Sequence, residues 1–106
     1  MIRKIFIFVA AALVLVSCLH DRFDRVENTP VSRYDIVYDD DMCGVFDNEA
    51  DSLVTPVEYE SLTFLMRTVQ DSVDVVLFSC SKDGMDGMMG VLEQNNEKME
   101  LLFPKE

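Results

Sequence analysis

The sequence predicts an α+β domain in which one helix packs against a small, mainly antiparallel sheet. Residues 56–70 follow a helix start and carry apolar side chains at three- and four-residue spacing. The other apolar runs after residue 33 are short, rich in β-branched and aromatic residues, and separated by turns of Asp, Asn and Gly. A single helix among short strands is typical of an α+β fold.

Two strand candidates precede the predicted helix. Residues 34–38 (YDIVY) have the β-branched and aromatic content of a strand, which three aspartates at 39–41 end. Residues 42–46 (MCGVF) form a second short apolar segment, either a strand or a turn packed on the core. A polar loop is expected over residues 47–52.

The predicted helix over residues 56–70 begins with a capping sequence. Thr55 is a favourable N-cap, Pro56 suits the first helical position, and Glu58 can return a hydrogen bond to the cap. The apolar stripe that follows consists of Leu62, Leu65, Met66 and Val69. Two threonines and a phenylalanine within the segment favour a strand, so an extended conformation is the alternative.

Three further strands are predicted after the helix. Residues 73–80 (VDVVLFSC) are apolar on both faces, which indicates a central strand. Residues 88–94 and 99–103 are expected to form the other two strands, with turns at residues 82–84 and 95–97.

The chain begins with a pattern typical of a secretory signal peptide. Arg3 and Lys4 precede an uninterrupted apolar run over residues 5–16, and polar residues follow. A membrane-spanning helix needs about 20 apolar residues, so this run is too short to span a bilayer. We therefore expect the segment to be removed.

The four residues Leu15-Val16-Ser17-Cys18 resemble the lipobox of bacterial lipoproteins, in which an aliphatic residue, a tolerant position and a small residue precede a cysteine. The resemblance implies that residues 1–17 are cleaved and that Cys18 carries a diacylglyceryl group and fatty acyl chains such as palmitate. Two or three chains anchor a protein where one binds only reversibly. The alternatives are an ordinary cleaved signal with a chance cysteine, or an uncleaved anchor.

The resemblance also implies a location in the bacterial cell envelope, attached to a membrane that we expect to be the outer membrane. Whether the protein faces the periplasm or the exterior stays open. We expect residues 18–32 to form a lipidated polar tether and residues 33–106 to form a single domain. A domain of this size lies near the lower limit of independent stability.

The chain is strongly acidic, with a formal net charge of −11. Removal of Arg3 and Lys4 with the signal peptide would take this charge to −13. Such a charge repels phosphate backbones, so nucleic acid is not an expected partner. A cationic protein, a cationic peptide or a metal ion is compatible, and the alternative is that the acidity serves only solubility.

Two cysteines remain once Cys18 is assigned to lipid, and we expect Cys43 and Cys80 to form a disulfide. The envelope is oxidising, and paired cysteines there tend to be bridged. Closing a loop of about 38 residues would stabilise the domain by about 4 kcal/mol if the bridge is unstrained. Two buried free thiols are the alternative.

The sequence lacks the residues of common hydrolytic sites. Its single histidine, His20, lies directly after the expected anchor, so Ser–His–Asp and Cys–His sites have no base within the domain. It contains no phosphate-binding glycine motif. Acidic pairs recur by chance among 20 carboxylates, and there is no Trp to stack on a sugar. We therefore expect no enzymatic activity and no cofactor.

An acidic segment has part of the spacing of a calcium loop. Asp47, Glu49, Asp51 and Glu58 occupy the first, third, fifth and twelfth positions. Ser52 replaces the glycine required at the sixth position, so a solvated acidic loop is the alternative.

Three methionines are candidates for copper(I). Met85, Met88 and Met89 lie among glycines and could gather their thioethers around a soft cation. Methionine more often fills gaps in a core, which is the alternative for these residues.

These observations predict a small envelope lipoprotein that binds a protein partner rather than catalysing a reaction. It would act as an inhibitor or immunity factor that caps a cationic enzyme, or as an accessory subunit of an envelope assembly. The alternative function is the binding of copper or calcium.

Overall fold

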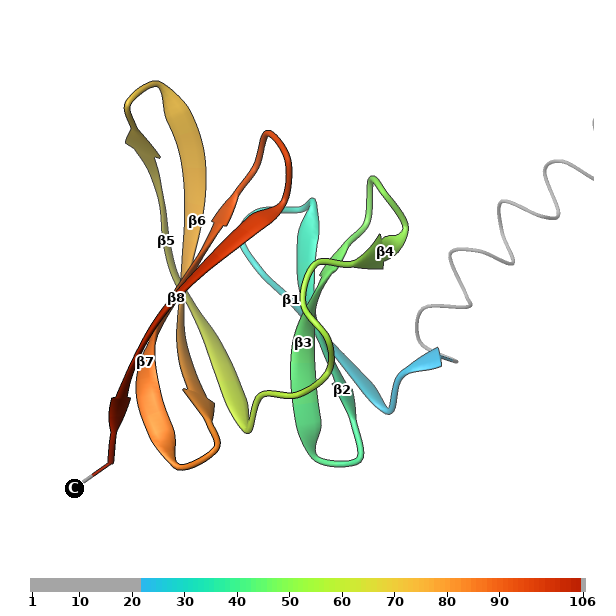
Figure 1. The fold of residues 1–106 in the computed structure, drawn as a ribbon. Coiled ribbons are helices and arrows are strands. Elements are labelled where there is room, and N and C mark those ends of the chain that lie inside the picture. Colours follow the sequence, from blue (N-terminus) through green and yellow to red (C-terminus); the bar gives the residue numbers. More distant parts are fainter. Residues whose placement is uncertain (1–21, 106) are drawn as a thin grey trace, which may run out of the picture.

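Two four-stranded antiparallel sheets, stacked face to face, form the part of the chain that the computed structural model describes, residues 22–105 (Figure 1). The first sheet contains β1 (Arg25–Asn28), β2 (Tyr34–Asp39), β3 (Met42–Asp47) and β4 (Ser52–Leu53). The second sheet contains β5 (Ser61–Gln70), β6 (Val73–Lys82), β7 (Met85–Leu92) and β8 (Glu97–Pro104). Each sheet follows the chain order, so neighbouring strands are also consecutive in sequence.

The core lies between the two sheets and is built by alternate residues of their strands. From the first sheet it takes Tyr34, Ile36, Cys43 and Val45. From the second sheet it takes Leu62, Val76, Phe78, Cys80, Met89 and Val91. All ten side chains are buried, as expected for the inward-facing half of each strand.

Three tight hairpins need residues with a left-handed backbone, and the sequence supplies them. Asp40 and Asp41 have φ of 52° and 65°, and Asp71 and Ser72 have φ of 51° and 65°. The third turn is formed by Asp83 and Gly84. Positive φ at both central residues matches the twist of the flanking strands, and Asp and Gly tolerate this conformation better than most residues.

The predicted helix over residues 56–70 is wrong, and the α+β class with it, because residues 61–70 form β5 and the described structure is all-β. Thr55 does not cap a helix; its hydroxyl oxygen accepts a hydrogen bond from the backbone N–H of Val45 at 3.0 Å. The backbone of Tyr59 then pairs with Cys43 through bonds of 2.8 and 3.0 Å. Residues 54–59 are thereby held along the edge of β3.

A β-bulge explains why β5 resembled a helix in its apolar spacing. The pairing of β5 with β6 shifts between Phe64 and Met66, where one extra residue is inserted. Leu62 is buried in the core, whereas Met66 lies on the opposite face and is exposed. The insertion interrupts strict alternation and leaves apolar residues three and four positions apart.

The predicted strands at 34–38, 73–80 and 99–103 are confirmed by β2, β6 and β8, with small shifts at their ends. Residues 42–46, for which a strand and a turn were both left open, form β3. The strand expected at 88–94 is confirmed as β7, which begins earlier and ends earlier. Residues 25–28 of the predicted tether form β1, so the folded domain begins before residue 33. Residues 18–21 of the tether and the signal peptide lie outside the described residues.

One buried carboxylate connects the two sheets. Asp47, at the end of β3, is fully buried. Its Oδ1 and Oδ2 accept hydrogen bonds from Nε and Nη2 of Arg33 at 3.2 and 3.0 Å. Oδ2 also accepts a bond from Nδ2 of Asn96, in the β7–β8 turn, at 2.6 Å. Backbone amides of Glu49 and Ala50 donate to Oδ1.

Two further bonds complete this network across the interface between the sheets. Arg33 donates from Nη1 to the carbonyl oxygen of Glu93 at 2.9 Å. The hydroxyl of Tyr34 donates to Oδ1 of Asn96 at 2.6 Å. The end of the β2–β3 pair is therefore bound to the β7–β8 turn by five polar residues, which we call the Asp47 network: Arg33, Tyr34, Asp47, Glu93 and Asn96.

The Asp47 network makes the free energy of unfolding of the domain dependent on pH. Burial acts to raise the pKa of Asp47, but hydrogen bonds from Arg33, Asn96 and two backbone amides outweigh it and hold the pKa at about 2. An unfolded Asp titrates near pH 3.9. The ionised carboxylate therefore contributes its full stabilisation above about pH 4, and this stabilisation is lost as the pH falls through about 2.

We expect Asp47→Asn to lower the free energy of unfolding at pH 7 by about 3 kcal/mol, because Arg33 and Asn96 lose a buried acceptor. Between pH 5 and 2 the gap between wild type and variant should shrink by about 2 kcal/mol. Urea unfolding across this pH range measures both effects. Asp74→Asn is the control, since it removes an exposed partner of Arg67 and should cost less than about 1 kcal/mol. A gap that stays constant with pH would contradict the assignment.

Candidate functional site

The outer faces of the two sheets differ in how they are covered. On the first sheet, Val37 and Phe46 point outward and are nevertheless buried. The ring of Phe23 packs edge-on against Phe46 with centroids 5.9 Å apart, and the guanidinium of Arg22 lies over Phe46 at 5.4 Å. The first described residues therefore cover part of this face.

The outer face of the second sheet leaves large apolar side chains exposed. Five of them come from β5, β7 and β8, and we call this surface the apolar face: Met66, Met88, Met99, Leu101 and Phe103. Their exposed fractions lie between 44% and 61%. The pairing of the strands places Met88 directly beside Leu101, so these side chains form a continuous surface.

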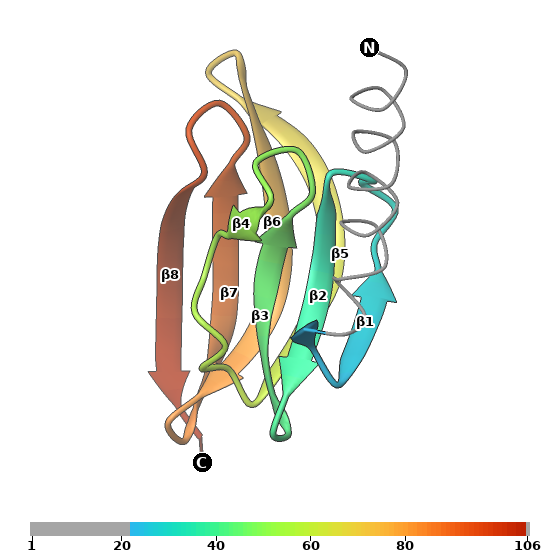
Figure 2. The same ribbon diagram turned by 90° about the vertical axis from the view of Figure 1, so that its right-hand side faces the viewer.

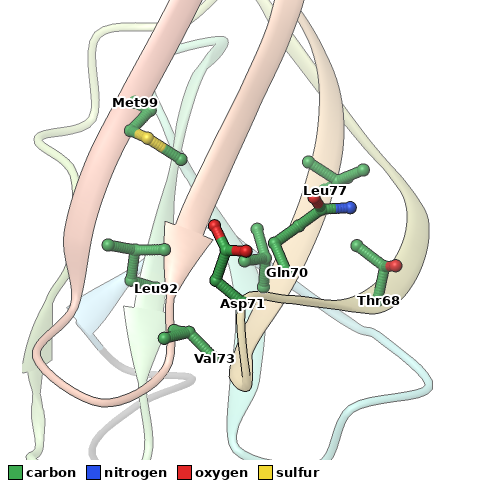
Figure 3. Close-up of a pocket in the computed structure, with 8 residues that line it drawn as sticks. Thr68, Gln70, Asp71, Val73, Leu77, Leu92 and Met99 are labelled. Atoms are coloured by element: carbon green, nitrogen blue, oxygen red, sulfur yellow. The ribbon is translucent and has the colours of Figure 1, made fainter.

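A groove of about 410 Å³ opens on the apolar face (Figure 3). Its apolar lining comes from Val73, Val75, Leu77, Leu92 and Met99. Figure 3 shows the polar ends of Gln70 and Asp71 beside these side chains, at the turn between β5 and β6. The groove is thus an apolar surface with one carboxylate at its end.

Gly90 lies beside three of the side chains that line the groove. A Cβ atom at this position would lie 3.3 Å from Cδ2 of Leu77, 3.4 Å from Cγ1 of Val75 and 3.7 Å from Cε of Met99. The missing side chain lets these three residues close over β7, and a larger residue would push them outward.

β8 exposes three of its apolar side chains and directs two charged side chains inward. Met99, Leu101 and Phe103 point outward and are 51%, 61% and 59% exposed. The side chains of Lys98 and Glu100, on the inner side, are 25% and 23% exposed. Leu102 also points inward and packs against the core, and Glu100 accepts a hydrogen bond from the hydroxyl of Tyr59 at 2.6 Å, so the inner side of β8 is held by the described residues themselves.

Acidic groups surround the apolar face. Asp71 lies at one end of the groove, Asp86 pairs with Phe103 across the ladder, and Glu97 begins β8. Lys105 is the basic residue beside them, and its ammonium group lies 3.7 Å from Asp86 and 4.0 Å from Glu60. The apolar face is therefore bordered mainly by negative charge.

The four calcium candidates each pair with a basic side chain. Asp47 and Glu49 both contact Arg33, at 3.0 and 3.4 Å. Glu58 lies 2.7 Å from Nζ of Lys82, and Asp51 lies 3.5 Å from Arg22. Both carboxylate oxygens of Asp47 also accept hydrogen bonds within the Asp47 network.

A different acidic cluster was missed from the sequence. Carboxylate oxygens of Asp24, Asp39 and Asp40 lie within 4.8 Å of one another, and all three residues are exposed. Desolvation, followed by the charges of Asp24 and Asp40, raises the pKa of Asp39. Asp24 lies in the predicted tether, so nothing in the sequence placed it beside the β2–β3 turn.

The copper candidates are divided between the two faces of β7. Met89 is buried in the core and Met88 is exposed on the apolar face. Met85 begins the strand beside the β6–β7 turn. Successive residues of a strand point to opposite faces, so Met88 and Met89 direct their sulfur atoms away from each other.

Cys43 and Cys80 are free thiols that face the same core from opposite sheets. Cys43 Sγ donates a hydrogen bond to the carbonyl oxygen of Tyr59 at 3.4 Å, and burial raises its pKa to about 11. Burial also raises the pKa of Cys80. Both thiols are therefore protonated at neutral pH, and the expected disulfide stays a prediction.

The expected lipidation site, Cys18, lies outside the described residues. Within residues 22–105, no helix is long and apolar enough to cross a membrane. None of the protein-family models, curated proteins or solved structures compared with this chain matches it.

We expect millimolar calcium to leave the melting temperature unchanged at neutral pH. The carboxylate of Asp47 is already bound to Arg33, and displacing this buried pair would cost the stabilisation that the network provides. Differential scanning calorimetry with calcium or with a chelator tests this. A rise of several degrees with calcium that disappears in Asp47→Asn would contradict the structural assignment of Asp47.

Proposed function

We propose that this chain is a small acidic lipoprotein of the bacterial cell envelope that binds a basic protein partner through the apolar face of its second sheet. The lipobox resemblance at residues 15–18 supports the anchor. The observation that carries the binding role is the exposed apolar row of β8, beside the groove lined by Leu77 and Met99. Large exposed apolar patches on small domains mark interaction sites.

The chemistry of the groove supports binding rather than catalysis. Its walls are aliphatic and thioether groups, and Asp71 is the one ionisable side chain among the residues that line it. An active site gathers several polar groups on one reacting centre. Apolar anchors with a charged surround are instead typical of protein interfaces, where the anchors supply affinity and the charges guide association.

The acidic residues around the apolar face support a basic partner. Asp71, Asp86 and Glu97 border the apolar face, and the whole chain carries a net charge of −11. A partner that fits would present apolar side chains flanked by Lys or Arg. Association should then slow as ionic strength rises, because salt screens the attraction between the two surfaces.

The binding test starts from photo-crosslinking in intact cells, with the crosslinker at Thr68 on the groove wall, followed by purification of the captured protein. We expect the purified pair to bind directly, with an affinity that Leu77→Lys lowers at least tenfold, because a charge replaces an apolar anchor in the groove. Leu53→Lys is the matched control: it changes an exposed leucine on the first sheet and should leave affinity unchanged. Circular dichroism verifies that both variants fold.

Titration calorimetry at low and high salt gives the affinities. Equal affinities for wild type and the Leu77→Lys variant would contradict the proposed face. Binding that does not weaken with salt would contradict the proposed basic character of the partner.

The anchor has its own test. We expect mass spectrometry of the mature protein to show Cys18 as the first residue, with a diacylglyceryl group on sulfur. Cys18→Ser should keep the signal peptide and carry no acyl chains, so its mass should equal that of the unmodified full-length chain. A mature protein with an unmodified Cys18 thiol would exclude the lipoprotein assignment.

A further inference from the structure

β8 is a free sheet edge that is open for pairing. It lies at the outer side of the second sheet and is paired there with β7 (Figure 2). The backbone N–H of Lys105 bonds to the carbonyl of Gly84 at 3.1 Å, so the odd-numbered residues direct their backbone groups toward β7. The even-numbered residues from Lys98 to Pro104 therefore direct theirs outward, away from the sheet.

The other sheet edges of the described residues are shorter or irregular. β1 has four residues and β4 has two. β5 is longer, but a bulge between Phe64 and Met66 interrupts it. Short strands, bulges, inward-pointing charges and proline all oppose edge pairing. β8 carries Lys98, Glu100 and Pro104, but it has eight residues in an uninterrupted ladder.

β8 carries little net charge although the chain is acidic. Its charged residues Glu97, Lys98 and Glu100 sum to −1 and Lys105 follows the strand, whereas the chain as a whole has a net charge of −11. Among residues 22–105, Lys98 forms ion pairs with Glu58 and Glu100, but Glu97 forms none. A second β8 could therefore approach this edge without the repulsion that the remaining surface imposes.

We propose that two copies of this chain pair through β8, antiparallel and centred on Leu101, to form one continuous sheet across a two-fold axis. In this register Leu101 lies opposite Leu101 of the second copy, and Met99 lies opposite Phe103. Glu97 meets Lys105 of the second copy, so the unpaired carboxylate gains an opposite charge on each side of the axis. All of these side chains lie on the apolar face.

The register is selected by charge and by the position of Pro104. Centring the pair on Glu100 would place like charges opposite each other, and centring it on Met99 would place Glu97 opposite Leu101. With Leu101 at the centre, Pro104 lies opposite Lys98 at the end of the ladder. Its missing N–H then removes only a terminal hydrogen bond from each half.

The proposed dimer is an interaction additional to partner binding, and it extends the apolar face across two copies of the chain. The exposed row of Met99, Leu101 and Phe103 would lie beside its own counterpart, so the two copies would share one wider apolar surface. The groove beside Leu77 stays on the outer face of each copy, where a partner can still reach it.

Cysteine crosslinking of the full-length protein in intact cells tests the pairing and its register. Leu101→Cys places two thiols opposite each other at a non-hydrogen-bonded pair, where Cα atoms lie about 4.5 Å apart, within reach of a disulfide. We expect a crosslinked dimer on non-reducing gels. Met99→Cys is the matched control, because its counterpart lies about 13 Å away along the strand.

A mixture of Met99→Cys and Phe103→Cys chains should crosslink, whereas each variant expressed separately should not. Leu101→Cys chains that stay monomeric under oxidation would overturn the proposal. Equal crosslinking of Leu101→Cys and Met99→Cys would also overturn it, since that result indicates random collision in the membrane.

Charge reversal gives a second test on exposed charged residues at the two ends of the proposed pair. Glu97→Lys should weaken the dimer about tenfold, because both symmetric pairs become repulsive. Combining Glu97→Lys with Lys105→Glu should restore crosslinking of Leu101→Cys to its original yield. Failure of the double reversal to restore it would contradict the register. The double reversal leaves the net charge of the chain unchanged, and Leu77→Lys leaves β8 unchanged, so loss of the dimer and loss of partner binding are measured separately.

Discussion

The buried carboxylate of Asp47 is the constraint on which the arrangement of the two sheets depends. Each sheet is a meander whose hairpins form locally, so nothing within one sheet fixes its position on the other. Asp47 accepts bonds from Arg33, on its own sheet, and from Asn96, in a turn of the second sheet. An apolar core is tolerant of sliding, whereas this network has one geometry that satisfies every buried polar group.

That fixed arrangement divides the four sheet faces into different roles. The two inner faces form the core, and the outer face of the first sheet is partly covered by Phe23 and Arg22. The outer face of the second sheet stays open and carries the apolar groove beside Leu77. Partner binding and edge pairing are both proposed for this sheet, because its exposed side chains are apolar in a chain that is otherwise strongly acidic.

Local patterns were sufficient to predict most strands but not the segment that joins the sheets. Residues 73–80 were recognisable as a strand because β-branched residues favour strands locally. The Asp-rich turns were recognisable because Asp tolerates the left-handed backbone that a tight turn requires. Thr55 and Pro56 predicted a helix because their tertiary role, holding the edge of β3, has no local signal. The Asp47 network was equally hidden, since Asn96 is 49 residues from Asp47. Met99, Leu101 and Phe103 alternate visibly in the sequence, but this pattern does not determine which face of the strand the fold buries.

The central claim is that a protein covers the apolar face in the envelope, and methionine oxidation measures this directly. Met66 and Met88 are exposed on that face, and Met42 lies on the first sheet as an internal reference. Met66 is on β5, at the opposite edge of the sheet from β8, so β8 pairing does not cover it. Peroxide should oxidise Met66 and Met88 more slowly in intact envelopes than in the purified protein, with Met42 unchanged. Equal rates for Met66 and Met88 in both samples would contradict the account.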